Sequence, residues 1–112
     1  MYENGKVEVS GWLASSEVDL LVVRDITGKT IKSIEWLDSP DIKIHLQSLG
    51  KDKENSDKCR FTFQIENDAY EGELYFCGYD INGVEKLNYV LDSGAAGFEN
   101  DNDILNLDYC YI

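Results

Sequence analysis

Alternating apolar and polar residues mark the first part of this chain as strand-forming. In KVEVSGWLA, residues 6–14, valine and leucine alternate with polar residues, as in a strand that buries one face. Gly11 falls on the inward phase, which predicts a bulge or a close approach of another backbone. The nearly continuous apolar run at 18–23 predicts a central strand. After the turn signal at 25–28, residues 29–36 are expected to return as its hairpin partner.

The same alternation of apolar and polar residues returns in the second half of the chain. It is clearest in CRFTFQIE, residues 59–66, where cysteine, phenylalanine and isoleucine share one face and polar residues share the other. Residues 72–79 predict another strand, and DING at 80–83 is typical of a hairpin turn into 84–91. These segments are expected to contribute the core.

Between the two groups of strands the apolar spacing becomes helical. Ser39 is a plausible N-cap, Pro40 suits the first helical position and Asp41 suits the first turn. Isoleucine and leucine follow at helical spacing, so we expect a short helix that ends at Gly50. The polar stretch KDKENSDK at 51–58 offers no apolar anchor and predicts a mobile surface loop.

Together these elements predict an all-β domain. We expect an immunoglobulin-like antiparallel β-sandwich of about six to seven strands, with one short helix in a crossover, over residues 1–92. Residues 93–112 start with small and acidic residues and are expected to be an acidic linker or tail. Within this tail, residues 104–112 are open to two interpretations, an additional edge strand or a disordered end.

Composition and charge narrow the classes of partner. The 112 residues contain 10 Lys and Arg against 22 Asp and Glu, a formal net charge of −12. Such a surface repels phosphate backbones and anionic membranes and attracts cations or basic partners, so no nucleic acid is expected. No apolar run approaches spanning length and no signal-peptide pattern opens the chain, so we expect no membrane insertion and a cytoplasmic location.

The residue types needed for catalysis are sparse. His45 is the single histidine, and its place on the predicted helix favours a surface position. No serine or cysteine stands in a nucleophile-elbow pattern, and no phosphate-binding glycine loop is present, so we expect no catalytic residues and no cofactor. Cys59, Cys77 and Cys110 are odd in number and widely spaced, which favours reduced thiols over disulfides or zinc, with Cys59 in the core.

One acidic stretch has a spacing found in calcium loops. Glu99, Asp101 and Asp103 occupy alternate positions, but Ile104 stands where glycine is needed and Cys110 where the bidentate glutamate is needed. The pattern therefore favours a solvated acidic linker, and no metal site is expected.

Aromatic residues provide the remaining candidates for binding. Trp12, Trp36, Tyr75, Tyr79 and Tyr89 could form a platform that stacks on sugars or contacts a partner protein. Residues of these types more often pack in a core or on a sheet face. Both interpretations stay open at this point.

The order of these features resembles a known family. ENGKVEVSGW, the turn RDITGK, a tryptophan followed by SPDI, a charged insertion, CRFTFQIE and a final hairpin are similar to a small β-sandwich accessory domain of bacterial glycosyltransferases. That domain lies at the N-terminal side of large family 2 and rhamnan-synthesis-type enzymes of Firmicutes-like bacteria. The resemblance covers residues 3–92. It departs at Ser39, where an arginine often precedes the Pro-Asp pair, and at Arg60, where a glycine often precedes the phenylalanine.

The resemblance implies a non-catalytic accessory module in cell-surface polysaccharide synthesis. Such a module would position a downstream catalytic domain, contact a protein partner or hold an acceptor glycan, and it would carry no catalytic residues of its own. The candidate glycan or partner surface comprises Trp12, Trp36, Asp41 and Tyr79. A free-standing carbohydrate-binding module is the first alternative, and a small enzyme is the second.

Overall fold

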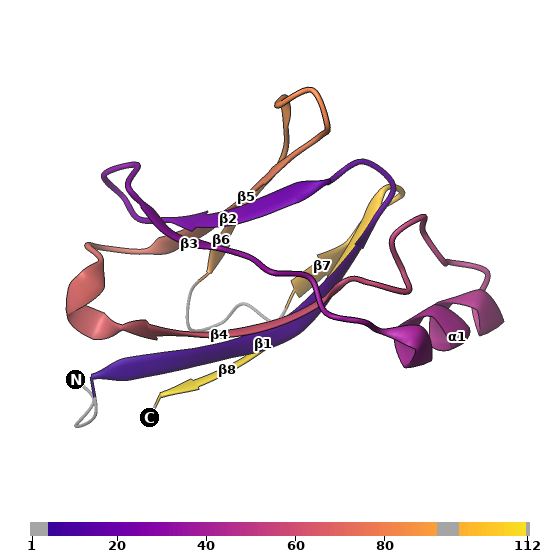
Figure 1. Cartoon of the computed structure of the whole chain (residues 1–112), viewed down its shortest axis with the longest axis horizontal. Helices are drawn as coiled ribbons and strands as arrows, with labels where there is room; N and C mark the ends of the chain where they lie inside the picture. The colour runs from indigo at the N-terminus through magenta and orange to yellow at the C-terminus, as the bar shows by residue number, and fades with distance from the viewer. Residues whose placement is uncertain (1–4, 92–96, 112) are drawn as a thin grey trace.

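Two antiparallel sheets packed face to face make up the computed structural model, which describes residues 5–91 and 97–111 (Figure 1). Sheet A has the strand order β4-β1-β8-β7 and sheet B the order β3-β2-β5-β6. The predicted antiparallel sandwich is confirmed, with eight strands in the described residues rather than six to seven. The elements are β1 (Lys6–Ser15), β2 (Leu20–Arg24), β3 (Thr30–Ser33), α1 (Pro40–Ser48), β4 (Arg60–Glu66), the 3-10 helix η1 (Asn67–Ala69), β5 (Leu74–Tyr79), β6 (Glu85–Leu91), β7 (Gly97–Glu99) and β8 (Asp103–Tyr111).

The strands predicted from alternation are all present, with their ends shifted by a few residues. The apolar run at 18–23 supplies β2, which lies between β3 and β5 and is therefore a central strand, as expected. Its hairpin partner β3 is shorter than the predicted 29–36, because the chain leaves sheet B after Ser33 and Trp36 packs across the core instead.

The C-terminal segment differs most from the prediction. β8 lies between β1 and β7 and pairs with β1 from Val7↔Tyr111 to Ser15↔Asp103, so it is an inner strand and neither an edge strand nor a disordered end. The acidic stretch before it is the turn of the β7–β8 hairpin, in which the Asn100 side chain accepts from the backbone N–H of Asn102 and Asp103. Residues 92–96 and 112 of the predicted tail lie outside the described residues.

The inner faces of the two sheets form one core. Three phenylalanine rings meet at its centre, with the Phe76 centroid 5.8 Å from that of Phe61 and 6.3 Å from that of Phe63. Trp36 closes the flank by an edge contact with Phe61 at 6.3 Å. Alternation therefore identified the core face of β4 correctly for Phe61, Phe63 and Ile65. Cys59 was predicted on the same face, but it precedes the strand and is buried against the crossover helix instead.

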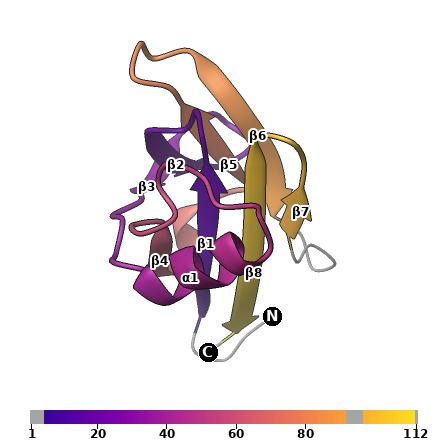
Figure 2. The ribbon, with the colours of Figure 1, turned by 90° about the vertical axis from the view of Figure 1, so that its right-hand side faces the viewer.

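The helix connects sheet B to sheet A and packs on one end of the outer face of sheet A (Figure 2). It forms a second apolar cluster there, made of Ala14, Ile42, Leu46, Cys59 and Ile104, with Trp12 packed against it. The predicted crossover helix is thus confirmed. It ends in a Schellman motif at Gly50, whose φ of 68° suits glycine and whose N–H donates to the Gln47 carbonyl.

The start of the helix and the loop after it differ from the prediction. Ser39 occupies the N-cap position, but its hydroxyl makes no helix cap: it donates to the Ser56 carbonyl at 2.8 Å and accepts from the Cys59 N–H at 3.0 Å. In the same loop the Asn55 amide accepts from Ser15 N at 2.7 Å and donates to Leu13 O at 3.0 Å. Residues 51–58 are therefore anchored by polar contacts rather than lying free on the surface.

Candidate functional site

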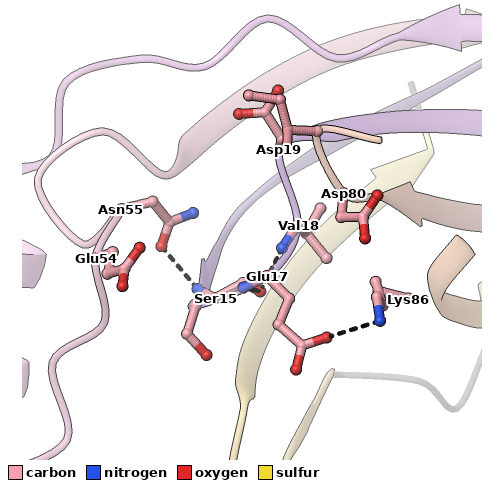
Figure 3. Close-up of a pocket in the computed structure, with 10 residues that line it drawn as sticks. Ser15, Glu17, Val18, Asp19, Glu54, Asn55, Asp80 and Lys86 are labelled. Atoms are coloured by element: carbon pink, nitrogen blue, oxygen red, sulfur yellow. Dashed lines mark hydrogen bonds and ion pairs between the residues drawn. The ribbon is translucent and has the colours of Figure 1, made fainter. Parts of the chain in front are cut away.

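An open hollow of about 470 Å³ lies at the end of the sandwich where β1 turns into β2 (Figure 3). Three separate parts of the chain form its wall: the β1–β2 connection, the loop at 51–58 and the β5–β6 hairpin. The lining residues are Ser15, Ser16, Glu17, Val18, Asp19, Glu54, Asn55, Asp80, Ile81 and Lys86.

A buried polar network forms the floor of this hollow. The Ser15 hydroxyl donates to Asp103 Oδ1 at 2.5 Å and accepts from the backbone N–H of Glu17 and Val18 at 3.1 and 2.9 Å. Asp103 is only 6% exposed. The Ser15 hydroxyl thus links the Asp103 carboxylate to two backbone N–H groups, which fixes the β1–β2 turn and ties it to the start of β8.

Acidic groups dominate the rim. Glu17, Asp19, Glu54 and Asp80 contribute four carboxylates, and Lys86 contributes one ammonium group, whose Nζ lies 3.7 Å from Glu17 Oε2. Asp80 also holds the hairpin turn, since its Oδ1 accepts from two backbone N–H groups that follow it. Among residues 5–91 and 97–111, no group of three or more His, Cys, Asp or Glu side chains is arranged to hold a metal ion.

A second, smaller hollow of about 220 Å³ lies on the outer face of sheet B. Arg24 lies across it: its guanidinium carbon is 5.8 Å from the centroid of the Tyr79 ring, and its Nη2 donates to Tyr79 Oη at 3.2 Å. Tyr75, Cys77 and Asn88 line the same hollow. Aromatic faces, a planar guanidinium and an amide are thus presented together on one sheet.

The two thiols whose side chains are described are not activated. Burial raises the pKa of Cys59 and also that of Cys77, so both sulfurs remain protonated near neutral pH. A nucleophilic cysteine requires the opposite shift. Both are free thiols, as predicted, while the side chain of Cys110 lies outside the description.

The hydrogen bonds of Asp25, at the rim of the sheet B hollow, lead us to expect that the stability of the protein depends on pH. The Thr27 hydroxyl lowers the pKa of Asp25 by donating to it at 2.6 Å, and the N–H groups of Glu71, Thr27 and Lys29 add to this. The folded-state pKa of Asp25 lies below its ordinary value of 3.8. The carboxylate therefore stabilises the folded protein fully above pH 3.8, and this stabilisation is lost as the pH falls through the folded-state pKa.

We therefore expect Asp25→Asn to destabilise the protein most near neutral pH. The difference in urea midpoint from wild type should shrink as pH is lowered through the range below about 4, where the wild-type carboxylate also becomes protonated. Asp52→Asn removes an exposed carboxylate and is the matched control for the change in net charge. A difference for Asp25→Asn that stays constant with pH would contradict the assignment.

The four residues predicted as a binding surface do not lie together. Trp12 lines a third hollow on the outer face of sheet A with Arg60, and Arg60 binds Asp41 in an ion pair at 2.6 Å that lowers the pKa of Asp41. Trp36 packs toward the core, and its Nε1 donates to the Asp19 carbonyl at 3.1 Å. Tyr79 lies on the other sheet, so the structure links Trp12 with Asp41 and separates both from Tyr79.

The structure also places the candidate histidine and the acidic residues with calcium-loop spacing. His45 is exposed on α1, as expected. Glu99 forms an ion pair with Lys51 at 2.8 Å, and Asp103 is buried, so the stretch with calcium-loop spacing is a hairpin turn rather than a solvated linker. The end hollow was missed because its residues are far apart in sequence; only the DING turn, which supplies Asp80, was recognisable locally.

Comparison with known proteins found no matching family model, no similar curated protein and no similar solved structure. Within the described ranges, none of the helical segments is long and apolar enough to cross a bilayer.

Proposed function

We propose that this chain is a non-catalytic accessory module of a bacterial glycosyltransferase that acts in cell-surface polysaccharide synthesis. Its task would be to position a catalytic domain, or to contact a protein partner or an acceptor glycan. The observation that carries the proposal is that the stretches bearing the family resemblance are consecutive parts of one sandwich. The described strands from β1 to β6 and the crossover helix all come from residues 6–91.

The use made of the polar side chains supports a non-catalytic role. Ser39 joins the helix start to β4, Asp25 holds a turn, and Ser15 and Asp103 bind one another beneath the end hollow. Each of these groups is already engaged in holding the backbone. General acid or base catalysis needs a group that is free to exchange a proton with a substrate.

The accessory role can be tested on the native gene. A glycosyltransferase domain in the same reading frame as this sequence would support the proposal. A frame that encodes this sandwich alone, together with turnover of a nucleotide sugar by the purified chain, would contradict it.

A carbohydrate-binding module is the second candidate, and the hollow on sheet B is the observation that favours it. Tyr75 and Tyr79 project on the same face of β5, because they are four positions apart in a strand, an even number. Arg24 and Asn88 border them with hydrogen-bonding groups. Small ligands are commonly held by a few polar groups placed around apolar and aromatic surface.

We expect Tyr79→Ala to weaken glycan binding by about tenfold or more, the scale on which truncation of an aromatic anchor weakens an interface. The measurement is isothermal titration of the purified chain with rhamnose-containing oligosaccharides, with folding checked by circular dichroism. Asn88→Ala changes an exposed residue of the same hollow and should weaken binding without unfolding the sheet.

Trp12→Ala, on the outer face of sheet A, is the control for the glycan experiment. Binding that is lost in this variant and retained in Tyr79→Ala would place the glycan on sheet A. Binding that is unchanged in all three variants would rule out the sheet B hollow and the hollow beside Trp12 as glycan sites.

A further inference from the structure

The tip of the β5–β6 hairpin exposes apolar side chains. Ile81 is 83% exposed and Val84 is 52% exposed, while Leu20, on the neighbouring strand β2, is 48% exposed. Leu20 pairs with Tyr79, so it lies next to the base of the hairpin. The tip projects from the body of the sandwich in both views (Figures 1 and 2). We call these three residues the apolar tip.

Single exposed apolar residues are common on protein surfaces, so the surroundings of the tip decide its meaning. Ile81 is one of the residues that line the end hollow, so the apolar tip and the acidic rim share a border. Lys86 is engaged with Glu17. Within the described parts of the chain, Asp19, Glu54 and Asp80 have no cationic partner.

We propose that the apolar tip and the end hollow dock a segment of a partner protein that carries lysine or arginine beside apolar residues. The uncompensated carboxylates would receive the basic side chains, and Ile81 would supply the apolar contact at the centre. Charge complementarity of this kind selects the partner and speeds its association, while a desolvated apolar contact holds it. The net charge of −12 acts in the same direction at long range.

Other ligand classes fit this surface less well. Phosphate groups and anionic lipids are repelled by the carboxylates. Among the described residues that line the hollow none is aromatic, so they offer a sugar ring no face on which to stack. The inference does not depend on the proposed glycosyltransferase role, because it is argued from the lining of the end hollow and the exposure of Ile81 alone.

The docking surface is held in place before any partner arrives. Ser15 and Asn55 connect its floor to the backbone of β1, and Asp80 closes the hairpin turn that carries Ile81. Because this part of the surface is already ordered, binding there costs less conformational entropy than ordering a free loop.

The test uses the whole chain and a fluorescently labelled synthetic peptide of alternating lysine and leucine residues. Fluorescence anisotropy gives the dissociation constant at low and at physiological salt. Ile81→Ser should weaken binding by roughly tenfold, because it removes the central apolar contact from an exposed position. The double variant Asp19→Asn and Glu54→Gln should weaken binding severalfold at low salt and flatten its dependence on salt.

A second double variant, Glu66→Gln with Glu73→Gln, is the matched control. It removes two exposed carboxylates at the opposite end of the strands and leaves the same net charge as the first double variant. Binding should be unchanged in this control. If both double variants weaken peptide binding equally, the peptide responds only to the net charge of the protein, and the proposal is overturned.

Other occupants give different results, and each would overturn the assignment of a basic segment. A peptide with glutamate in place of lysine should not bind, and its binding would indicate a purely apolar contact. Self-association in sedimentation velocity that Ile81→Ser abolishes would identify a second copy as the occupant. Absence of measurable binding of the lysine and leucine peptide at low salt would also refute the proposal.

Discussion

Replacing Phe76 with alanine should lower the free energy of unfolding by about 3–5 kcal/mol, the usual cost of truncating a buried phenylalanine. Phe76 is fully buried and its ring meets those of Phe61 and Phe63, one sheet against the other. Loss of the ring removes apolar contact and leaves a cavity that the two sheets cannot fill without disturbing their pairing. Urea denaturation measured by fluorescence tests this value.

Ile81→Ala is the control for the Phe76 variant, because Ile81 is 83% exposed. We expect a change within about 0.5 kcal/mol, as for most surface substitutions. If Phe76→Ala does not fold, Phe76→Leu retains part of the side chain and should give a smaller, measurable loss. A loss below about 1 kcal/mol for Phe76→Ala would mean that the two sheets are not held together at this point.

The second large effect is expected for Gly11→Ala, with a loss of about 1–3 kcal/mol or more. A Cβ on Gly11 would overlap the backbone carbonyl oxygen of Asn106 and would lie 3.2 Å from the Cα of Leu107. β1 and β8 are both inner strands of sheet A, so neither can move aside without displacing β4 or β7. The close backbone approach predicted from the inward phase of Gly11 is thus confirmed, and its pairing shows no bulge.

The sign of the change makes this prediction decisive. Glycine weakens a strand interior, so an alanine with sufficient space would stabilise the protein. Increased stability in Gly11→Ala would therefore contradict the close approach of β8. Ser10→Ala, at the neighbouring position of β1, is the control and should stay within about 0.5 kcal/mol of wild type.

Local patterns predicted the elements whose own side-chain period or turn chemistry is clear, even where the pairing partner is distant, as for β4 and β1. Alternation in CRFTFQIE and the DING turn depend on side-chain periodicity and turn chemistry, which are properties of short segments. For residues 104–112 the local pattern left an edge strand and a disordered end both open, and it did not indicate the inner position that β8 occupies. Its partner β1 is at the other end of the chain, and the acidic turn before it has the composition of a linker.

For the candidate binding residues, too, the sequence revealed the residue types but not their positions in the fold. Aromatic residues could be recognised by type, but their faces could not: Trp36 is partly buried against the core, while Tyr79 faces outward beside Arg24. The end hollow combines the β1–β2 connection, the loop at 51–58 and the hairpin tip. A site made from separated segments carries no signature in any one of them.

Sequence alone therefore establishes a β-rich chain with a strongly acidic surface and one crossover helix, because period, capping and charge are encoded within a few neighbouring residues. Folding determines the rest. It places β8 at the centre of sheet A, anchors a polar loop through Asn55 and brings carboxylates to one end of the sandwich. These outcomes arise from backbone pairing and side-chain contacts between distant residues, for which no local pattern exists.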